Sequence, residues 1–294
     1  MISRNWKISL LILLFGVLIG RRFYYRFLDP HLYITFFDVG QGDAILIHFP
    51  YGKTMLVDAG GGFRDWNAGT AILFPELARM GILRIDYAVL SHPDQDHGYG
   101  FLGIMEELKV GSFLYNAHEH SAKRRLFGEL LGAATKHEVA LQPLFRTSSF
   151  PVGSAVVKTF VSAAEQSNNR SLVQLLEFAG CRILLTGDME IEEEANIGNI
   201  GKIHFLKVPH HGARHSLTEK WLRSLSPLFA IISVGLGNPY GHPHSNTINR
   251  LLRNGAQVLR TDFHGYIRFS ISPTGEARCE NAHGSCGAAR CYLP

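Results

Sequence analysis

Apolar and polar positions alternate in short blocks along most of the chain, which indicates strands separated by turns and helices. In the first half, apolar runs bounded by glycine predict strands, and runs with helical spacing predict helices. The expected strands are residues 31–40, 43–50, 54–62, 84–92 and 111–118, and the expected helices are residues 70–81 and 96–110.

The second half repeats this plan. The expected strands are residues 154–163, a hairpin over 171–190 that turns at Ala179-Gly180, 202–209, 229–235 and a closing strand pair over 257–271, and the expected helices are residues 216–225 and 244–255. Mixed sheets with helices outside them, an α/β or α+β fold, fit this order. Polar clusters follow several of the strands, and loops held by a rigid sheet are common positions for site residues.

The N-terminus carries an apolar run, Ile8–Gly20, with basic residues on both sides. As a helix this run rises about 20 Å, less than the roughly 30 Å hydrocarbon core of a bilayer. No small-x-small cleavage site follows it, which favours an uncleaved signal-anchor; a buried first helix is the alternative. We therefore expect a signal-anchor and linker over residues 1–30, one folded domain over 31–275 and a cysteine-containing tail over 276–294. A membrane-anchored or exported protein outside the cytoplasm is expected, and a cytoplasmic location stays open.

Composition narrows the class of protein only slightly. The chain has 294 residues, of which 46% are hydrophobic, enough for a packed core. Its net charge of +4 is compatible with a polyanionic substrate without requiring one. The absence of repeats in the sequence excludes solenoids and coiled coils.

The four cysteines do not decide the compartment. Cys181 lies in an apolar run and is expected to be a buried thiol. Cys279, Cys286 and Cys291 lie in the tail, where a disulfide and a frayed end are both open. With His283 they could also bind zinc, but their spacing fits no standard zinc finger.

The densest chemistry lies in the stretch LSHPDQDHGYG, where His92, Asp94, Asp96 and His97 form an H-x-D-x-D-H pattern. Carboxylates this close repel one another, and each is costly to remove from water. A loop wrapped around divalent cations would need them. If the loop curls, its residues can line two adjacent ions.

Other strand ends carry compatible groups: Asp58, Asp188, the pair His210 and His211, and the pair His242 and His244. Taken singly, such residues are usually turn, cap or surface residues. Taken together they predict a centre in which Asp188 bridges two ions, about 3.5–4 Å apart in such sites, that activate water and stabilise the entering and leaving oxygens.

Seven stretches, in collinear order over roughly residues 32–272, resemble the metallo-β-lactamase superfamily and, within it, the hydrolase domain of ComEC-type competence proteins. They are FFDVGQGDAILIHFP, LVDAGG, LSHPDQDHGYG, SLVQLLEFAGCRILLTGD, LKVPHHGARHS, ISVGLGNPYGHPH and RTDFHGYIRF. The resemblance implies an α+β fold, the αββα four-layer sandwich with two mixed β-sheets. It also implies that a separate DNA-uptake channel protein is a partner, because the channel part of those proteins has no match in this chain.

The resemblance also assigns roles by position. It implies that His92 and Asp94 bind one ion, that Asp96, His97 and His211 bind the other, and that Asp188 bridges them. The remaining residues would act around the ions: His210 in catalysis or phosphate contact, His242 at the substrate or leaving group, Asp58 in orienting the acidic loop, and Gln41 and Asp43 at the floor of the site.

Two departures from the superfamily pattern bear on the metal. Asp94 replaces the second histidine of the usual H-x-H-x-D-H signature, as in ComEC-like members. The isolated histidine of the third motif has no counterpart, and Asn168, Asn169 and Ser171 occupy that segment. More oxygen ligands favour Mn²⁺ or Mg²⁺ relative to Zn²⁺, so two divalent ions are expected, either manganese or zinc.

The expected function is a metal-dependent phosphodiesterase, a nuclease acting on DNA, since both ions can contact the oxygens of a phosphodiester. The alternatives are a phosphodiesterase acting on a cell-envelope polymer, a lactamase-like or thioester hydrolase, and a non-catalytic binding module. A nuclease should present basic and aromatic residues along a groove; candidates are residues 120–127, Arg64, Arg214 and Arg268. The sequence gives no indication of the oligomeric state.

Overall fold

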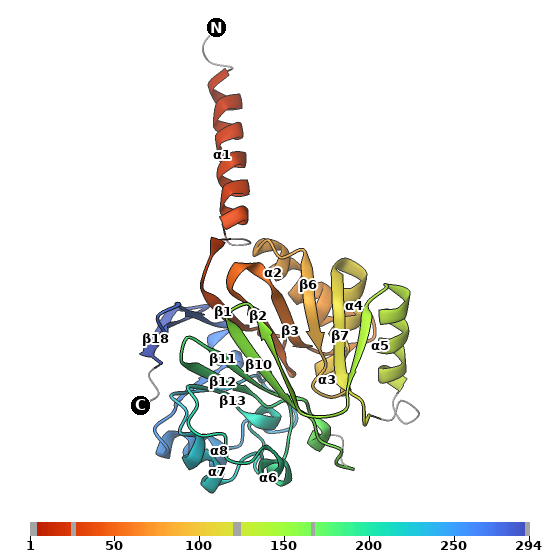
Figure 1. The fold of residues 1–294 in the computed structure, drawn as a ribbon, viewed down its shortest axis with the longest axis vertical. Helices are drawn as coiled ribbons and strands as arrows, with labels where there is room; N and C mark the ends of the chain where they lie inside the picture. Colours follow the sequence, from red (N-terminus) through yellow and green to blue (C-terminus); the bar gives the residue numbers. More distant parts are fainter. Residues whose placement is uncertain (1–4, 25–27, 120–124, 166–167, 292–294) are drawn as a thin grey trace.

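Two large mixed sheets pack face to face and carry helices on their outer faces (Figure 1). The computed structural model describes residues 5–24, 28–119, 125–165 and 168–291. The layers run helix, sheet, sheet, helix, which confirms the αββα sandwich.

The first sheet has nine strands among the described residues, in the order β18 (Gly284–Arg290), β17 (Glu276–Asn281), β16 (Ile267–Ile271), β1 (Leu32–Phe36), β2 (Ala44–His48), β3 (Thr54–Ala59), β6 (Arg84–Val89), β7 (Lys109–Asn116) and β8 (Ala140–Leu144). Pairing is antiparallel from β18 to β3 and parallel from β3 to β8.

The second sheet has seven strands within the same described ranges, in the order β15 (Gln257–Arg260), β14 (Phe229–Ile232), β13 (Phe205–Lys207), β12 (Cys181–Leu185), β11 (Val173–Phe178), β10 (Ala155–Phe160) and β9 (Ser148–Val152). Here β12 to β15 are parallel and β9 to β12 antiparallel. A small hairpin, β4 (Gly62–Phe63) with β5 (Trp66–Asn67), follows β3.

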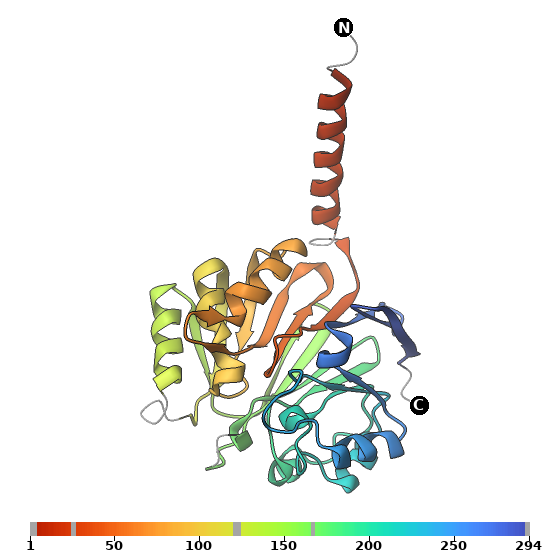
Figure 2. The same ribbon diagram turned by 180° about the vertical axis from the view of Figure 1, so that it is seen from behind.

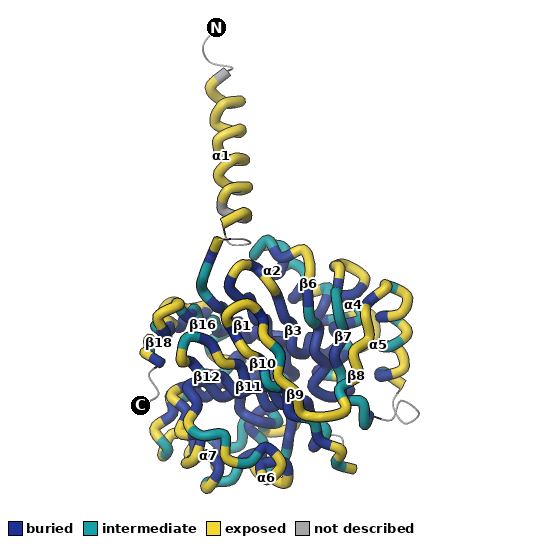
Figure 3. Tube along the Cα trace, in the orientation of Figure 1, coloured by how far each residue is buried: buried dark blue, intermediate teal, exposed yellow. Residues whose placement is uncertain are grey.

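Six of the described helices cover the two outer faces of the sandwich. The helices of the described residues are α1 (Asn5–Phe23), α2 (Phe74–Arg79), α3 (Gln95–Gly98), α4 (Gly100–Glu107), α5 (Arg125–Lys136), α6 (Glu194–Ile197), α7 (Glu219–Leu225), α8 (Ser245–Arg253) and α9 (Thr261–His264). Helices α2, α4 and α5 pack their apolar sides on the first sheet, and α6, α7 and α8 pack theirs on the second. Burial is therefore concentrated in the strands, as Figure 3 shows.

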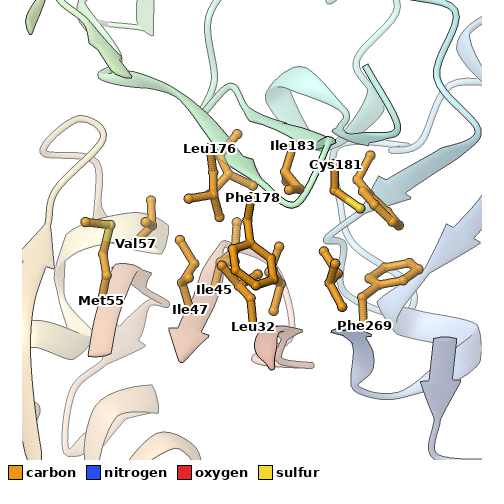
Figure 4. Close-up of a cluster of buried hydrophobic side chains, with 14 of the residues drawn as sticks. Leu32, Ile45, Ile47, Met55, Val57, Leu176, Phe178, Cys181, Ile183 and Phe269 are labelled. Carbon is orange, nitrogen blue, oxygen red and sulfur yellow. The ribbon is translucent and has the colours of Figure 1, made fainter. Parts of the chain in front are cut away.

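The central core lies between the sheets (Figure 4). Phe269 of the first sheet meets Phe205 and Phe229 of the second, with ring centroids 4.7 and 5.2 Å apart. Edge-on aromatic contacts of this kind add to the gain from burial. These rings hold the two sheets in the relative position that brings their strand ends together.

Two expected elements differ from the observed ones. Residues 257–271 were expected to form one strand pair, but β15 joins the second sheet and β16 the first, with α9 between them. The helix expected over residues 96–110 is two short helices, α3 and α4, and β7 begins at Lys109.

The C-terminal residues are part of the sheet. The expected domain boundary after residue 275 falls between β16 and β17, which are neighbouring strands. Cys279 and Cys286 form a disulfide, and Cys181 forms one with Cys291 across 110 residues. The expectation of a free thiol at Cys181 is therefore wrong, and these cysteines offer no thiolate to zinc.

Helix α1 projects from the sandwich in both views (Figures 1 and 2). It includes the apolar run Ile8–Gly20, and its described side chains are exposed. Among the described residues, no helix combines the length and apolar character that crossing a membrane requires.

Truncation of Phe269 tests the contact between the sheets. Because the ring is 1% exposed, Phe269→Ala should lower the free energy of unfolding by about 3–5 kcal/mol. Phe145→Ala removes a ring that is 68% exposed and should change it by less than about 0.5 kcal/mol. Urea unfolding of the full chain measures both values, and equal effects would contradict this description of the core.

Candidate metal centre

The carboxyl ends of strands from both sheets meet at one edge of the sandwich. Asp58 lies near the end of β3, and the loop carrying His92 and Asp96 follows β6 in the same sheet. Asp188 follows β12, and His211 follows β13, in the second sheet. Parallel strands place their carboxyl ends at one edge, where α/β proteins commonly bind ligands.

The acidic loop curls because a short helix begins inside it. Asp94 has extended backbone angles at the N-terminus of α3, and its carbonyl accepts hydrogen bonds from the amides of His97 and Gly98. This turn sends the two carboxylates in different directions. Asp94 Oδ2 lies 3.4 Å from His92 Nε2, and Asp96 Oδ2 lies 3.4 Å from His211 Nε2.

Close backbone packing holds this loop in place. The amide of Asp43 donates to the carbonyl of Asp96 at 3.2 Å. A Cβ at Gly42 would stand 2.1 Å from that same carbonyl oxygen, so only glycine fits there. Gly42, the second glycine of the DVGQGD stretch, therefore allows β2 to lie this close to the acidic loop.

Each of the three buried histidines has one ring nitrogen fixed by the protein. His211 Nδ1 donates to the carbonyl of Ser233 at 2.9 Å, and His97 Nδ1 donates to Asp58 Oδ2 at 2.8 Å. His92 Nδ1 lies 3.1 Å from Ser91 Oγ, which itself donates to Asp58. With Nδ1 as the donor in each ring, Nε2 is the nitrogen left to bind a cation once the ring is neutral.

Asp58 orients this set from a β-bulge. The register between β2 and β3 shifts at this point, so that no residue of β2 lies opposite Asp58. The backbone of Asp58 is left-handed, with a φ of 56°. Bulges re-aim side chains next to functional sites. The Asp58 carboxylate accepts from the Ser91 amide at 2.8 Å, from Ser91 Oγ at 2.6 Å and from His97, and thereby fixes both loop histidines.

The Nε2 atoms converge on the carboxylate of Asp188. Asp188 Oδ2 lies 3.3 Å from His97 Nε2 and 3.4 Å from His211 Nε2. One ligand atom each from His92, His97 and Asp188 lies within 4.8 Å of the others, as do atoms from Asp96, His97 and His211. In the described part of the chain, the three Nε2 atoms are buried without a hydrogen-bond partner.

This donor set fits divalent cations. Buried imidazole nitrogens with free lone pairs and carboxylate oxygens are ligands for zinc and manganese. The backbone is strained at this centre as well, because His210 and His211 have left-handed φ values of 49° and 51°.

The buried charges shift the pKa values of these groups. Burial, with His97 alongside, lowers the pKa of His92 to about 4. At His211 burial alone would lower the pKa, but the carboxylates of Asp188, Asp96 and Asp43 outweigh it and raise it to about 9. Burial opposes ionisation of Asp188, yet His211, His97 and Lys207 hold its pKa well below the usual range.

The remaining predicted residues lie around this centre. His210 Nε2 lies 3.9 Å from Asp188 Oδ2, and the His242 ring centroid is 5.7 Å from that of His210. Burial lowers the pKa of both histidines. His244 is instead a helix cap, because its Nδ1 accepts from the amide of Asn246 at the start of α8.

The segment that lacks the third histidine contributes bracing contacts. Ser171 Oγ accepts from the Asp188 amide at 3.2 Å, and Asn169 Oδ1 accepts from the Glu190 amide at 2.9 Å. Gln41 Oε1 accepts from the Gly235 amide at 3.3 Å, at the start of the loop that carries His242.

Sequence reasoning missed two residues of the centre. Ser91 links Asp58 to His92, and Lys207 is fully buried with its ammonium beside Asp43 and Asp188. Lys207 carried a signal: it is a charged residue between apolar positions of the buried strand FLKV, and lysine is almost never fully buried unless it is paired.

Without bound metal, the free energy of unfolding should fall as the pH rises from about 6.5 to 9. In chelator-treated protein, His211 has a folded pKa of about 9 against an ordinary 6.5. Its contribution, about 3 kcal/mol, is therefore complete below about pH 6.5 and is lost as the pH rises through about 9.

Urea unfolding between pH 6 and 10 measures this loss. His211→Gln should remove that part of the pH dependence, whereas His215→Gln, at an exposed position, should keep it. Stability of the chelated wild-type protein that rises over this range would contradict the arrangement of charges described here.

Comparison with known proteins agrees with the fold. Residues 37–235 match the metallo-beta-lactamase superfamily model. ComE operon protein 3 of Bacillus subtilis is 30% identical over 84% of this chain and 34% of its own length. Recombination protein 2 of Haemophilus influenzae is 30% identical over 91% of this chain and 33% of its own length. Competence protein ComA of Neisseria gonorrhoeae is 27% identical over 82% of this chain and 33% of its own length. The chain thus spans about a third of the length of these relatives.

Solved structures agree on the fold. CmlA, a diiron beta-hydroxylase from Streptomyces venezuelae, matches with a TM-score of 0.54 at 16% identity, over 83% of this chain and 54% of its own. The metallo-beta-lactamase fold protein YhfI from Bacillus subtilis matches with a TM-score of 0.51 at 9% identity, over 81% and 99%. The family model, which covers more than half of the chain, decides its membership: this protein belongs to the metallo-beta-lactamase superfamily and is related within it to competence proteins of the ComEC type.

Proposed function

We propose that this protein is a phosphodiesterase that cleaves DNA with the help of two divalent cations, manganese or zinc. The observation that carries the proposal is the set of three buried histidine Nε2 atoms without a hydrogen-bond partner that face carboxylates: His97 and His211 face Asp188, His211 also faces Asp96, and His92 faces Asp94. The relationship to competence proteins supports DNA as the substrate.

The ligands would divide as the family resemblance implies. His92 and Asp94 would hold one cation, Asp96, His97 and His211 the other, and Asp188 would contact both. Cations in such a site lower the pKa of water and neutralise charge on phosphoryl oxygens. Asp58 would keep His92 and His97 in the tautomer that binds metal, through the contacts described above.

The proton would be carried by the protein. His210 is partly exposed, with 29% of its side chain accessible, and lies beside Asp188 and Glu190. Because burial lowers its pKa, its imidazole is neutral at pH 7 and can take a proton from the attacking water and deliver it to the leaving oxygen. His242, next to His210, would contact the substrate on that side.

Exposed aromatic residues flank the centre, as nucleic-acid binding would require. The hairpin β4–β5 carries Phe63 and Trp66, which are 67% and 45% exposed. It lies against the acidic loop, since Gln95 donates to the carbonyl of Gly62 at 2.6 Å. On the other side Tyr240, 67% exposed, stacks on His242 with ring centroids 5.9 Å apart. Flat exposed rings can stack on unpaired bases.

The expected basic residues are placed unevenly. Arg64 lies over the ring of Phe63 on the hairpin, and Arg214 is exposed just after His211. Arg268 instead lies over Tyr33 and pairs with Glu280 on the first sheet. Of the stretch 120–127, residues 120–124 lie outside the described residues.

The two disulfides support a location outside the cytoplasm, which we propose as well, because disulfides persist in oxidising compartments. A membrane anchor through the apolar N-terminal helix and a separate channel protein as partner are further parts of the proposal.

DNA cleavage by the full chain tests the proposed activity. Labelled single- and double-stranded DNA should be cleaved with Mn²⁺ or Zn²⁺ and not with chelator. Asp96→Asn removes a ligand and should reduce the rate by at least about 100-fold, the upper end of losses seen when a ligand's supporting partner is removed. Glu106→Gln, on the exposed side of α4, is the matched control. Cleavage of nitrocefin, a thioester or an envelope polymer, without cleavage of DNA, would replace this proposal.

Removal of the hairpin aromatics tests the substrate contact separately. In an Asp96→Asn background, Phe63→Ala with Trp66→Ala should weaken binding of single-stranded DNA by at least about fivefold, because each stacked base contributes roughly 1–3 kcal/mol. Phe145→Ala, which removes an equally exposed ring elsewhere, should leave the dissociation constant unchanged. Fluorescence anisotropy measures both, and equal dissociation constants would contradict the role of the hairpin.

A further inference from the structure

Lys207 places an ammonium group at the floor of the metal centre. It is the last residue of β13, and its side chain is fully buried. Nζ donates to the carbonyl of Gly187 at 2.8 Å, lies 3.4 Å from Asp188 Oδ1 and is in tight contact with Asp43 Oδ2. A buried cation is costly unless it is paired and hydrogen-bonded, and Lys207 is both.

The two oxygens of Asp188 face different partners. Oδ1 is the oxygen beside Lys207, whereas Oδ2 is the one close to His97 and His211 Nε2. The ammonium and the histidine nitrogens thus lie on opposite sides of one carboxylate. If Asp188 rotated, it would have to give up the contact with Lys207.

Asp43 pairs with the ammonium of Lys207 rather than with the histidines. Two further groups with metal-ligand spacing include Asp43, one with Asp188 and His211 and one with Asp58 and His97. However, the histidine nitrogens that lie within 4 Å of Asp43 are Nδ1 of His97 and Nδ1 of His211, at 3.7 and 3.8 Å. Both of these atoms already donate to other acceptors, Asp58 and the carbonyl of Ser233.

We propose that Lys207 is a positioning residue whose ammonium serves as a fixed third cation of the centre. It neutralises Asp43, and it holds Asp188 Oδ1 so that only Oδ2 faces the two metal positions. Charge balance agrees with this role. The centre has five carboxylates, those of Asp43, Asp58, Asp94, Asp96 and Asp188. Two divalent cations neutralise four of their negative charges, and the ammonium of Lys207 neutralises the fifth.

The inference rests on the two-cation centre of the proposed function but not on the identity of the substrate. It predicts that Lys207 determines the affinity of the centre for its second cation and the magnetic coupling between the two cations. A lysine that merely filled space would affect folding alone. Metal stoichiometry and the magnetic coupling between two bound Mn²⁺ ions separate these roles, and neither depends on activity.

The experiment uses the full chain titrated with Mn²⁺ by calorimetry and electron paramagnetic resonance. Wild-type protein should bind two ions and give a spin-coupled spectrum. Lys207→Met should lower the affinity for the second Mn²⁺ ion by about 10- to 100-fold, as the loss of a group that orients a ligand does. The variant should also give the spectrum of isolated Mn²⁺. Lys53→Met is the matched control, because Lys53 also pairs with a buried carboxylate, Asp86, at 3.1 Å; it should behave as wild type.

A second variant decides the question if Lys207→Met fails to fold. Asp43→Asn with Lys207→Met removes both charges of the buried pair, so the protein should fold, but Asp188 Oδ1 is still released. The inference predicts weak binding of the second ion and an uncoupled spectrum for this variant.

Two tightly bound, coupled ions in either variant would overturn the role of Lys207 and leave the proposed function standing. Wild-type protein that binds neither Mn²⁺ nor Zn²⁺ would instead overturn the proposed function, and the inference about Lys207 with it.

Discussion

Negative charge buried at one edge of the sandwich is the constraint on which the rest of the structure depends. Asp43, Asp58 and Asp188 are each at most 4% exposed and lie beside the carboxylates of the acidic loop. Such groups repel one another and lose their hydration, so they are tolerated only with matching positive charge. The chain supplies part of it through Lys207 and through histidines that hold protons tightly when no metal competes. The rest is what two divalent cations would provide, and the orientation of the histidine rings is suited to them.

The fold creates this edge by bringing two sheets together. The acidic loop and Asp58 come from the first sheet, and Asp188, His211 and Lys207 come from the second. Neither sheet holds a complete ligand set, so the centre exists only because the aromatic core around Phe269 fixes the sheets relative to each other.

Much of this arrangement could be predicted from the sequence, because it depends on local patterns. The acidic loop and the strand ends carry dense, short-range signals, and the structure brings together the residues expected to bind metal. Other features depend on contacts between distant residues. The apolar pattern of 257–271 shows two strands but not that they join different sheets, and cysteine spacing does not reveal that Cys181 pairs with Cys291. The apolar neighbours of Lys207 indicate that it is buried and paired, but only the fold shows which carboxylates surround it.

Anomalous diffraction from crystals of the full chain grown with Mn²⁺ tests the central claim most directly, because it locates the cations without reference to activity. The account predicts two peaks at the edge of the sandwich, one beside His92 and Asp94 and one beside Asp96 and His211, with Asp188 between them and the ammonium of Lys207 still against Asp43. An intact fold that shows no peak there, or a peak beside Asp43 with Lys207 displaced, would contradict it.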